Sequence, residues 1–432
     1  MSDAKYRTEP SASVADQDFI INPLSKGLGS VRQGLRANEI AEVGWNLLRE
    51  DVSLPAAFLH EDRLQHNLRW MKAFASTYGV KLAPHGKTTM APKLFHRQLE
   101  AGAWGITLAT ATQVRVAYEH GVRRVLMANE LVGRENVSAI VRLLEDPDFD
   151  FFSLVDSVEL VEHLARMLPA NGRKLNVLVE LGVDGGRTGV RDDAGLEAVL
   201  QALEEHRGRI GLCGVEVYEG VLAEEGEIRK LLQRAVDVTA RLAKEGRFDR
   251  SPAILSGAGS AWYDVVAEVF TAGKLDRAVE IVLRPGCYLT HDVGVYRDAQ
   301  ERIKHRNPVA KQLESSLMPA LQLWAYVQSV PEKEKAILGL GKRDAAFDAG
   351  LPKPALHYRP GEPKPKEVPN AWVLTKMMDQ HAFMQIPPGA GVRVGDMIGL
   401  DISHPCLTFD KWKYLAMVDP EYRVIDVVET FF

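Results

Sequence analysis

Cysteine is scarce in this sequence, which has only Cys213, Cys287 and Cys406 among 432 residues. Three cysteines cannot build a disulfide framework, so we expect a reducing compartment. No apolar run reaches the roughly 18 residues that a membrane span needs. The polar N-terminus also lacks the apolar stretch of a secretory signal. These absences predict a cytoplasmic protein.

An excess of positive charge is also missing. Lys and Arg number 53 against 58 Asp and Glu, so the formal net charge is −5. This balance argues against a nucleic acid or an anionic membrane as the main partner and leaves small molecules as the expected one. Charged residues make up 26% and hydrophobic residues 46%, as in ordinary soluble proteins. The length fits two or three domains, or one barrel with an appendage.

Short apolar runs alternate with helical patterns between residues 81 and 288. The spacing of Leu231, Leu232, Ala235, Val238 and Leu242, for example, predicts a helix that stops at Gly246. Alternating strands and helices indicate a parallel sheet, and eight repeats favour an α/β fold with a (β/α)8 TIM-type barrel over an open doubly wound sheet. The eight runs are 81–87, 105–110, 125–130, 151–157, 176–182, 212–220, 253–260 and 282–288.

The pattern changes after about residue 295. Residues 297–318 are charged and predicted to be helical, and short strand-like runs broken by Pro- and Gly-rich loops follow them. We therefore predict a barrel over 51–295 and a smaller, mostly antiparallel β domain over 296–432. Residues 1–50 are expected to form an N-terminal tail and a segment that joins the β domain.

The first barrel run ends in a lysine, Lys87, beside a glycine. Active sites of such barrels lie at the carboxyl ends of the strands. A lysine there is partly desolvated, which suits an amine that forms a Schiff base. The alternative is a strand-end lysine whose ammonium group reaches solvent.

Glycine-rich segments end the seventh and eighth runs, as Ser256-Gly257-Ala258-Gly259-Ser260 and Arg284-Pro285-Gly286-Cys287-Tyr288. Glycine lets backbone N–H groups approach an anion, so these segments are candidates for a phosphate site. Ordinary turns between strands and helices need glycine as well. Taken with Lys87, a phosphate site and an amine nucleophile describe a pocket for pyridoxal phosphate.

Two other strand ends carry polar candidates. The fifth run leads into a loop in which Arg187 either faces a cofactor ring or pairs with Asp184 to shape the turn. In the sixth run, Glu216 and Tyr218 alternate onto one face, where they either reach a ring nitrogen or are buried barrel residues.

A His-x-Cys pair, His404 and Cys406, lies in the predicted β domain. Because the residue before a proline favours extended geometry, we expect both side chains on one strand face. Imidazole and thiolate suit zinc, although two ligands cannot close a site. His381 is a candidate third ligand from a neighbouring strand, or a hydrogen-bonded surface histidine.

Five motifs occur in a characteristic order: Pro-His-Gly-Lys-Thr, Asp-Gly-Gly-Arg-Thr-Gly, Ser-Gly-Ala-Gly-Ser, Arg-Pro-Gly-Cys-Tyr and His-x-Cys-x-Thr. This ordered set resembles the D-serine dehydratase and D-threonine aldolase family, pyridoxal phosphate enzymes of the alanine racemase fold type. The resemblance extends from about Pro55 to the C-terminus. It implies a homodimer that binds pyridoxal 5'-phosphate and a divalent metal, zinc in the dehydratases, and acts on a small amino acid.

The resemblance also implies roles for individual residues. Lys87 is similar to the catalytic lysine that binds the cofactor covalently, and Arg187 to a contact of the cofactor ring. Cofactor contacts are implied at Tyr218, Gly257, Gly259, Ser260, Gly286 and Tyr288. His404 and Cys406 are similar to the metal ligands. In this family His-x-Cys is typical of dehydratases and His-x-Asp of aldolases, so Cys406 favours dehydration.

The expected activity is therefore a lyase reaction that converts a β-hydroxy-D-amino acid, such as D-serine or D-threonine, to a 2-oxo acid and ammonia. The nearest alternative is retro-aldol cleavage to glycine and an aldehyde. Racemisation is a weaker alternative because it needs no metal. A non-catalytic role in cofactor homeostasis is disfavoured, because single-barrel proteins of that kind lack residues comparable to 297–432.

Overall fold

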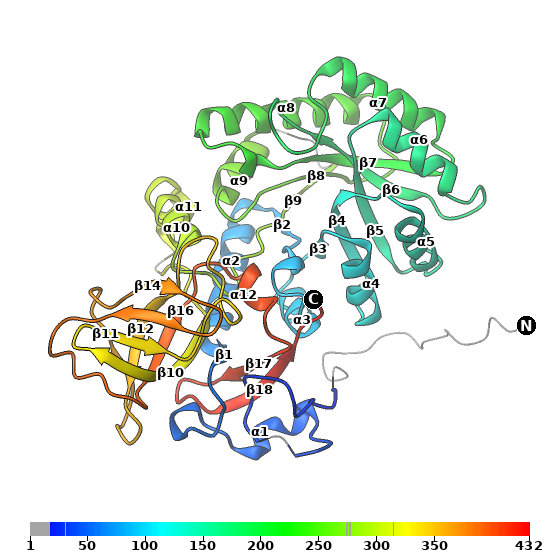
Figure 1. The fold of residues 1–432 in the computed structure, drawn as a ribbon. Helices are drawn as coiled ribbons and strands as arrows, with labels where there is room; N and C mark the ends of the chain where they lie inside the picture. Colours follow the sequence, from blue (N-terminus) through cyan, green and yellow to red (C-terminus); the bar gives the residue numbers. More distant parts are fainter. Residues whose placement is uncertain (1–17, 31, 274, 276–277, 314) are drawn as a thin grey trace, which may run out of the picture.

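The computed structural model describes residues 18–432 except 31, 274, 276, 277 and 314. Residues 1–17 of the expected tail lie outside the described part. The chain forms an α/β barrel and a β domain, which lie side by side in Figure 1. None of the helices in the described ranges is long and apolar enough to cross a membrane.

Eight parallel strands form the barrel sheet in the order β2-β9-β8-β7-β6-β5-β4-β3. A bridge between His85 and Thr107 joins the two ends of this order, so the sheet closes on itself. Each strand begins within three residues of a predicted run, which confirms the predicted barrel. The strands are β2 (Lys81–Leu82), β3 (Ile106–Leu108), β4 (Arg124–Glu130), β5 (Asp150–Val155), β6 (Leu175–Leu181), β7 (Ile210–Val217), β8 (Ala253–Gly257) and β9 (Val279–Leu283).

Helices cover the outside of the barrel (Figure 1). In α8 the apolar positions 231, 232, 235, 238 and 242 are buried, and Gly246 adopts φ +66° just beyond the helix, as the spacing predicted. The longer helices are α2 (Glu61–Tyr78), α3 (Pro92–Glu100), α4 (Ala111–Glu119), α5 (Arg134–Leu143), α6 (Val158–Met167), α7 (Asp193–Glu205), α8 (Glu225–Lys244), α9 (Tyr263–Ala272) and α10 (Val295–Arg306).

The remaining helices are single turns or little more. They include a 3-10 turn after β2, which carries a candidate site residue, and a short helix in the β domain. These elements are η2 (Ala37–Glu39), α1 (Ile40–Val43), η3 (Leu47–Arg49), η4 (Gly86–Thr88), η5 (Glu219–Val221), α11 (Pro308–Gln312) and α12 (Cys406–Phe409).

The second sheet is mostly antiparallel, in the order β13-β12-β16-β10-β1-β17-β18, and β10 also pairs with β11. Its strand β1 pairs antiparallel with β10 and parallel with β17, although its residues lie within the range predicted for the barrel. The strands are β1 (Ala56–His60), β10 (Leu321–Glu332), β11 (Lys335–Leu338), β12 (Lys353–Tyr358), β13 (Lys366–Glu367), β14 (Val373–Met377), β15 (Ala382–Gln385), β16 (Met397–Asp401), β17 (Tyr414–Val418) and β18 (Val424–Glu429).

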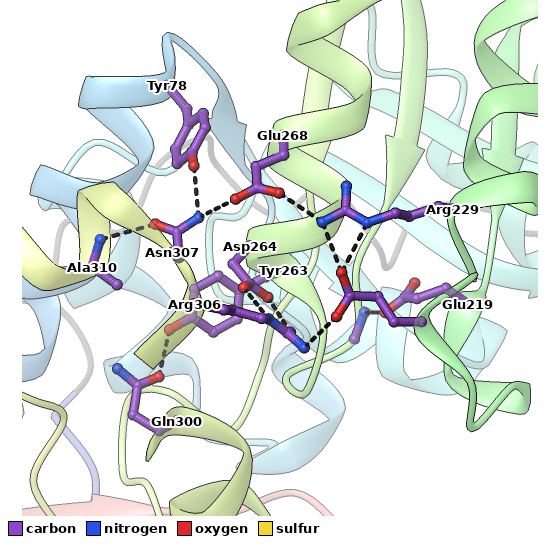
Figure 2. Close-up of polar contacts among 12 residues, drawn as sticks. Tyr78, Glu219, Arg229, Tyr263, Asp264, Glu268, Gln300, Arg306, Asn307 and Ala310 are labelled. Carbon is purple, nitrogen blue, oxygen red and sulfur yellow. Dashed lines mark hydrogen bonds and ion pairs between the residues drawn. The ribbon is translucent and has the colours of Figure 1, made fainter. Parts of the chain in front are cut away.

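A polar network holds α10 and α11, which connect the two domains, against the barrel (Figure 2). Arg306 donates two hydrogen bonds of 2.7 Å to the carboxylate of Asp264, which is fully buried in α9. The side-chain amide of Asn307 donates to the hydroxyl of Tyr78 at 2.7 Å. Because buried polar groups are costly without partners, these contacts fix the connection relative to the barrel helices.

Candidate active site

A cavity of about 300 Å³ opens at the carboxyl ends of the barrel strands, where α12 of the β domain approaches the barrel. Its lining includes eight of the ten predicted site residues: Lys87, Arg187, Tyr218, Gly259, Ser260, Gly286, His404 and Cys406. A larger hollow of about 690 Å³ is lined by α7 and α8 on the outside of the barrel and contains none of them. The cavity at the strand ends is therefore the candidate active site.

Lys87 is carried by the 3-10 turn η4, directly after β2. The turn packs closely on the core: a Cβ at Gly86 would lie 2.7 Å from the ring of Phe95 and 2.8 Å from Ile106. Only glycine permits this approach. The contact fixes the backbone that presents Lys87 to the cavity.

Two backbone amides converge on the hydroxyl oxygen of Ser260. The N–H of Gly286 donates to Ser260 Oγ at 3.2 Å, and the N–H of Cys287 donates at 3.1 Å. Paired amides beside a serine hydroxyl are the donors that a phosphate group requires. This cluster is the candidate phosphate site, and it lies among the glycine-rich strand ends singled out in the sequence.

The turn after β8 has a second set of amides with a different partner. The N–H groups of Ala258 and Gly259 donate to the carboxylate of Glu219 at 3.1 and 2.7 Å. Burial raises the pKa of Glu219, and these amide hydrogen bonds act in the opposite direction. The Glu219 carboxylate thus accepts hydrogen bonds from two amides, those of Ala258 and Gly259, that the sequence had indicated as donors to a bound phosphate.

Arg284 lines the cavity and was missed as a site residue in the sequence. Its guanidinium contacts Glu216 in a buried ion pair and donates to Ser256 Oγ at 3.0 Å. Burial raises the pKa of Glu216, whereas the charge of Arg284 lowers it and favours the ionised carboxylate. Glu216 is therefore an interior partner of Arg284. The signal available was the position of Arg284 at the end of the eighth run.

Arg187 and Tyr218 form one wall of the cavity. The guanidinium carbon of Arg187 lies 4.7 Å from the ring centroid of Tyr218, the geometry of a cation–π contact. Burial, together with Glu219, raises the pKa of the Tyr218 hydroxyl. Arg187 is thus held by stacking on Tyr218 and by a hydrogen bond of 3.5 Å from its Nε to Thr188 Oγ1.

His404 and Cys406 line the cavity from the β domain, but the predicted strand geometry is wrong. Pro405 adopts φ −61° and ψ −49°, and Cys406 begins the short helix α12. The fixed φ of proline suits a helix start as well as an extended chain, and the helix is the outcome here. Nδ1 of His404 lies 2.8 Å from Asp348 Oδ2.

The electrostatics of this pair fit a thiolate beside an imidazolium. Hydrogen bonds with Cys287 and His404 lower the pKa of Cys406 to about 4. The contact with Cys406, aided by Asp348, raises the pKa of His404 to about 9. Imidazole and thiolate are donors that fit zinc. Within the described ranges, no three His, Cys, Asp or Glu side chains are already grouped to hold a metal ion.

Three other candidates lie elsewhere. Gly257 is buried at the end of β8, where an added Cβ would lie 3.3 Å from the ring of Phe270. The hydroxyl of Tyr288 accepts from the Gln98 amide at 3.2 Å, and Tyr288 lines a different cavity of about 140 Å³. His381 is exposed and precedes β15. None of these three residues lines the candidate active site.

The residues of the cavity fit pyridoxal phosphate. Nδ1 of His85, which lines the cavity, is buried and has no hydrogen-bond partner among the described residues. Burial and the charges of Lys87 and Arg284 lower its pKa well below the usual value, so the ring is neutral. An amine, a neutral imidazole and a converging set of amides suit a polar aromatic ring with an attached anion.

Two sequence families match the chain in succession. Residues 59–274 match the family described as "Alanine racemase, N-terminal domain", and residues 320–418 match the family described as "Putative serine dehydratase domain". The first match covers the barrel except its last strand, β9, and the second covers most of the β domain. The order agrees with the two sheets of the structure.

Individual enzymes are also similar to this chain in sequence. A D-threonine aldolase of Arthrobacter sp. is 27% identical over 395 residues, which are 90% of this chain and 94% of the relative. A D-threo-3-hydroxyaspartate dehydratase of Delftia sp. (strain HT23) is 27% identical over 245 residues, 56% of this chain and 62% of that protein.

Solved structures agree in fold. The D-threonine aldolase from Filomicrobium marinum has a TM-score of 0.73 at 23% identity and covers 90% of this chain and 97% of its own. A D-threo-3-hydroxyaspartate dehydratase variant with one cysteine replaced by alanine, in a metal-free form, has a TM-score of 0.68 at 21% identity and covers 90% and 99%. The chain therefore belongs to the D-serine dehydratase and D-threonine aldolase family of pyridoxal phosphate enzymes, which have the alanine racemase fold.

Proposed function

We propose that this protein is a pyridoxal phosphate- and zinc-dependent lyase that converts a β-hydroxy-D-amino acid, such as D-serine or D-threonine, to a 2-oxo acid and ammonia. The observation that carries the proposal is that Lys87 of the barrel and the donors His404 and Cys406 of the β domain line one cavity of about 300 Å³. A cavity of this size suits a small cofactor and substrate.

The cofactor, when bound, stores the electrons released at the substrate α-carbon, and a metal ion stabilises negative charge on a β-oxygen that leaves. Hydroxide is a poor leaving group, so dehydration gains most from such a metal. The soft thiol of Cys406 favours zinc for this task.

The residues of the chain have separate tasks in this proposal. The amine of Lys87 accepts the proton from the substrate α-carbon and holds it at Nζ. The amides of Gly286 and Cys287, with the hydroxyl of Ser260, hold the cofactor phosphate. Arg284 supplies a fixed positive charge at the cavity wall, held by its contact with Glu216.

The metal donors lie on the β domain rather than on the barrel. In this proposal His404 and Cys406 would reach the substrate from the β domain, and Lys87 would reach it from the barrel. Support for a metal comes from the dehydratase relative, for which structures exist of a histidine-to-alanine variant and of a cysteine-to-alanine variant in the metal-free form. The histidine and cysteine replaced there lie two positions apart, the spacing of His404 and Cys406.

Retro-aldol cleavage to glycine and an aldehyde is the second candidate. The observation that favours it is the match to the Arthrobacter D-threonine aldolase, which spans 90% of this chain. In that reaction a base would remove the proton of the β-hydroxyl, and the bond between the α- and β-carbons would break.

The two functions are separated by assays on the purified protein. With D-serine we expect pyruvate and ammonia in equal amounts, no reaction with L-serine, and loss of activity after chelation that zinc restores. Lys87→Ala serves as the inactive control. Glycine as the main product would contradict the dehydratase proposal, and activity that survives complete metal removal would contradict the metal requirement.

A further inference from the structure

Two cysteines from different domains meet at the candidate active site. Cys287 follows β9 of the barrel, and Cys406 begins α12 of the β domain, 119 residues later in the chain. Their sulfur atoms lie 4.0 Å apart, and both residues line the same cavity. Cys287 is almost completely buried. The third cysteine, Cys213, lies inside the barrel and does not line this cavity.

The separation of the two sulfur atoms matches the edge of a metal tetrahedron. With metal–sulfur bonds of about 2.3 Å and tetrahedral angles, two thiolate ligands of one zinc ion lie about 3.8 Å apart. The 4.0 Å between Cys287 and Cys406 therefore needs a shift of only a few tenths of an ångström. Neither sulfur has to leave the cavity wall.

His404 is already oriented as a metal-binding histidine. Its Nδ1 lies 2.8 Å from the carboxylate of Asp348. Metal-ligating histidines commonly donate one ring N–H to a carboxylate, which leaves the other nitrogen free for the metal. Here that nitrogen is Nε2. The His404 side chain already contacts Cys406, but within the described ranges the three side chains are not yet grouped to hold a metal ion, so metal binding has to draw His404 and Cys287 closer together.

We propose that Cys287 is a third protein ligand of the metal, so that Cys287, Cys406 and His404 form a three-ligand site whose fourth position is open to the substrate. The inference rests on the proposed function, because that function requires a metal. Three protein ligands with one open position are typical of catalytic zinc, including sites with two cysteines and one histidine. Two thiolates also select zinc over harder ions such as Mg²⁺.

Cys287 would thereby link the metal to the phosphate site. Its backbone N–H donates to Ser260 Oγ at 3.1 Å, in the cluster that is suited to the cofactor phosphate. Its side chain faces Cys406. One residue would thus set the distance between the cofactor and the metal.

The test counts the sulfur ligands of the metal. X-ray absorption of the wild-type holoenzyme loaded with zinc, under a phosphine reductant, should show two sulfur atoms in the first shell. Cobalt(II) substitution gives a second readout, since the intensity of the thiolate-to-cobalt band rises with the number of thiolates. Cys287→Ala and Cys287→Ser should each show about half of the wild-type band and bind zinc about 100-fold more weakly. Cys213→Ala is the matched control and should match wild type in both measurements.

One sulfur atom in the wild-type spectrum would overturn the inference, as would a full cobalt band and unchanged zinc affinity in Cys287→Ala. If Cys287→Ala behaved like wild type but Cys406→Ala lost the thiolate-to-cobalt band, Cys287 would not be a ligand, and the proposed metal-dependent function would still stand. A wild-type protein that binds neither zinc nor cobalt would overturn both. The wild-type spectrum needs no variant, so it decides the question even where a substitution prevents folding.

Discussion

Replacement of Gly286 by alanine tests whether close packing at the barrel mouth holds the cofactor site together. A Cβ at position 286 would lie 2.7 Å from Cβ of His85, 2.8 Å from the His85 carbonyl oxygen and 2.8 Å from Thr88 Oγ1. Ordinary contacts begin at 3.4 Å, so the two segments must separate by about 0.7 Å. The carbonyl oxygen belongs to the backbone that leads into Lys87, so it cannot rotate out of the way.

The expected magnitude has two parts. Overpacking of this kind lowers the free energy of unfolding by about 1–3 kcal/mol. The separation also moves the amides of Gly286 and Cys287, and each hydrogen bond to a charged group contributes about 1.5–3 kcal/mol. Loss of one such bond weakens cofactor binding about 10- to 100-fold.

The assay combines cofactor titration, followed by visible absorbance, with thermal unfolding of the cofactor-free protein. Gly226→Ala is the control, because nothing lies within 4 Å of a Cβ at that position in α8. It should bind the cofactor normally and unfold at the same or a higher temperature. Wild-type affinity and unfolding temperature in Gly286→Ala would refute the reasoning.

Buried charges give further expected outcomes. Burial lowers the pKa of His60 to about 4, so the contribution of His60 to stability is constant above pH 6.5 and falls as the pH drops toward 4. His60→Gln should remove about 2 kcal/mol of the loss of stability between pH 7 and 5 in urea titrations, and an unchanged pH dependence would contradict this. Arg306→Met strands the buried Asp264 and should cost about 3–5 kcal/mol, much of which Asp264→Asn in the same chain should restore; additive losses would count against the pairing. Lys87→Ala should lose the visible absorbance of the bound cofactor, and a normally coloured variant would exclude its covalent role.

The barrel was predictable because each of its strands is a short apolar run followed by a helical pattern. The run at 176–182, for example, became β6 with nearly all of its side chains buried. Such strands can be recognised from their own sequence, because a strand buried on both faces is a nearly continuous run of hydrophobic residues. The β domain was less predictable. β12 mixes exposed and half-buried residues, and β1 depends on partners more than 260 residues away, such as the pairing of Phe58 with Gln322.

The candidate site was predictable where a residue ends a strand. Lys87, Ser260 and Gly286 were found in this way, because the carboxyl ends of parallel strands meet at one edge. The meeting of Cys287 with Cys406 was not, since nothing in the spacing of residues from two domains indicates their distance. Tyr288 looked equivalent to Gly286 in sequence, but the chain turns after β9, and the Tyr288 side chain contacts Gln98 and lines a different cavity.

The most direct test of the central claim is the fate of D-threonine in the presence of the zinc-loaded enzyme, followed by NMR. Dehydration gives 2-oxobutanoate and ammonia, whereas retro-aldol cleavage gives glycine and acetaldehyde, so one substrate reports both reactions. The account predicts 2-oxobutanoate as the main product, with its formation dependent on Lys87, His404 and Cys406. Glycine and acetaldehyde as the main products would contradict it.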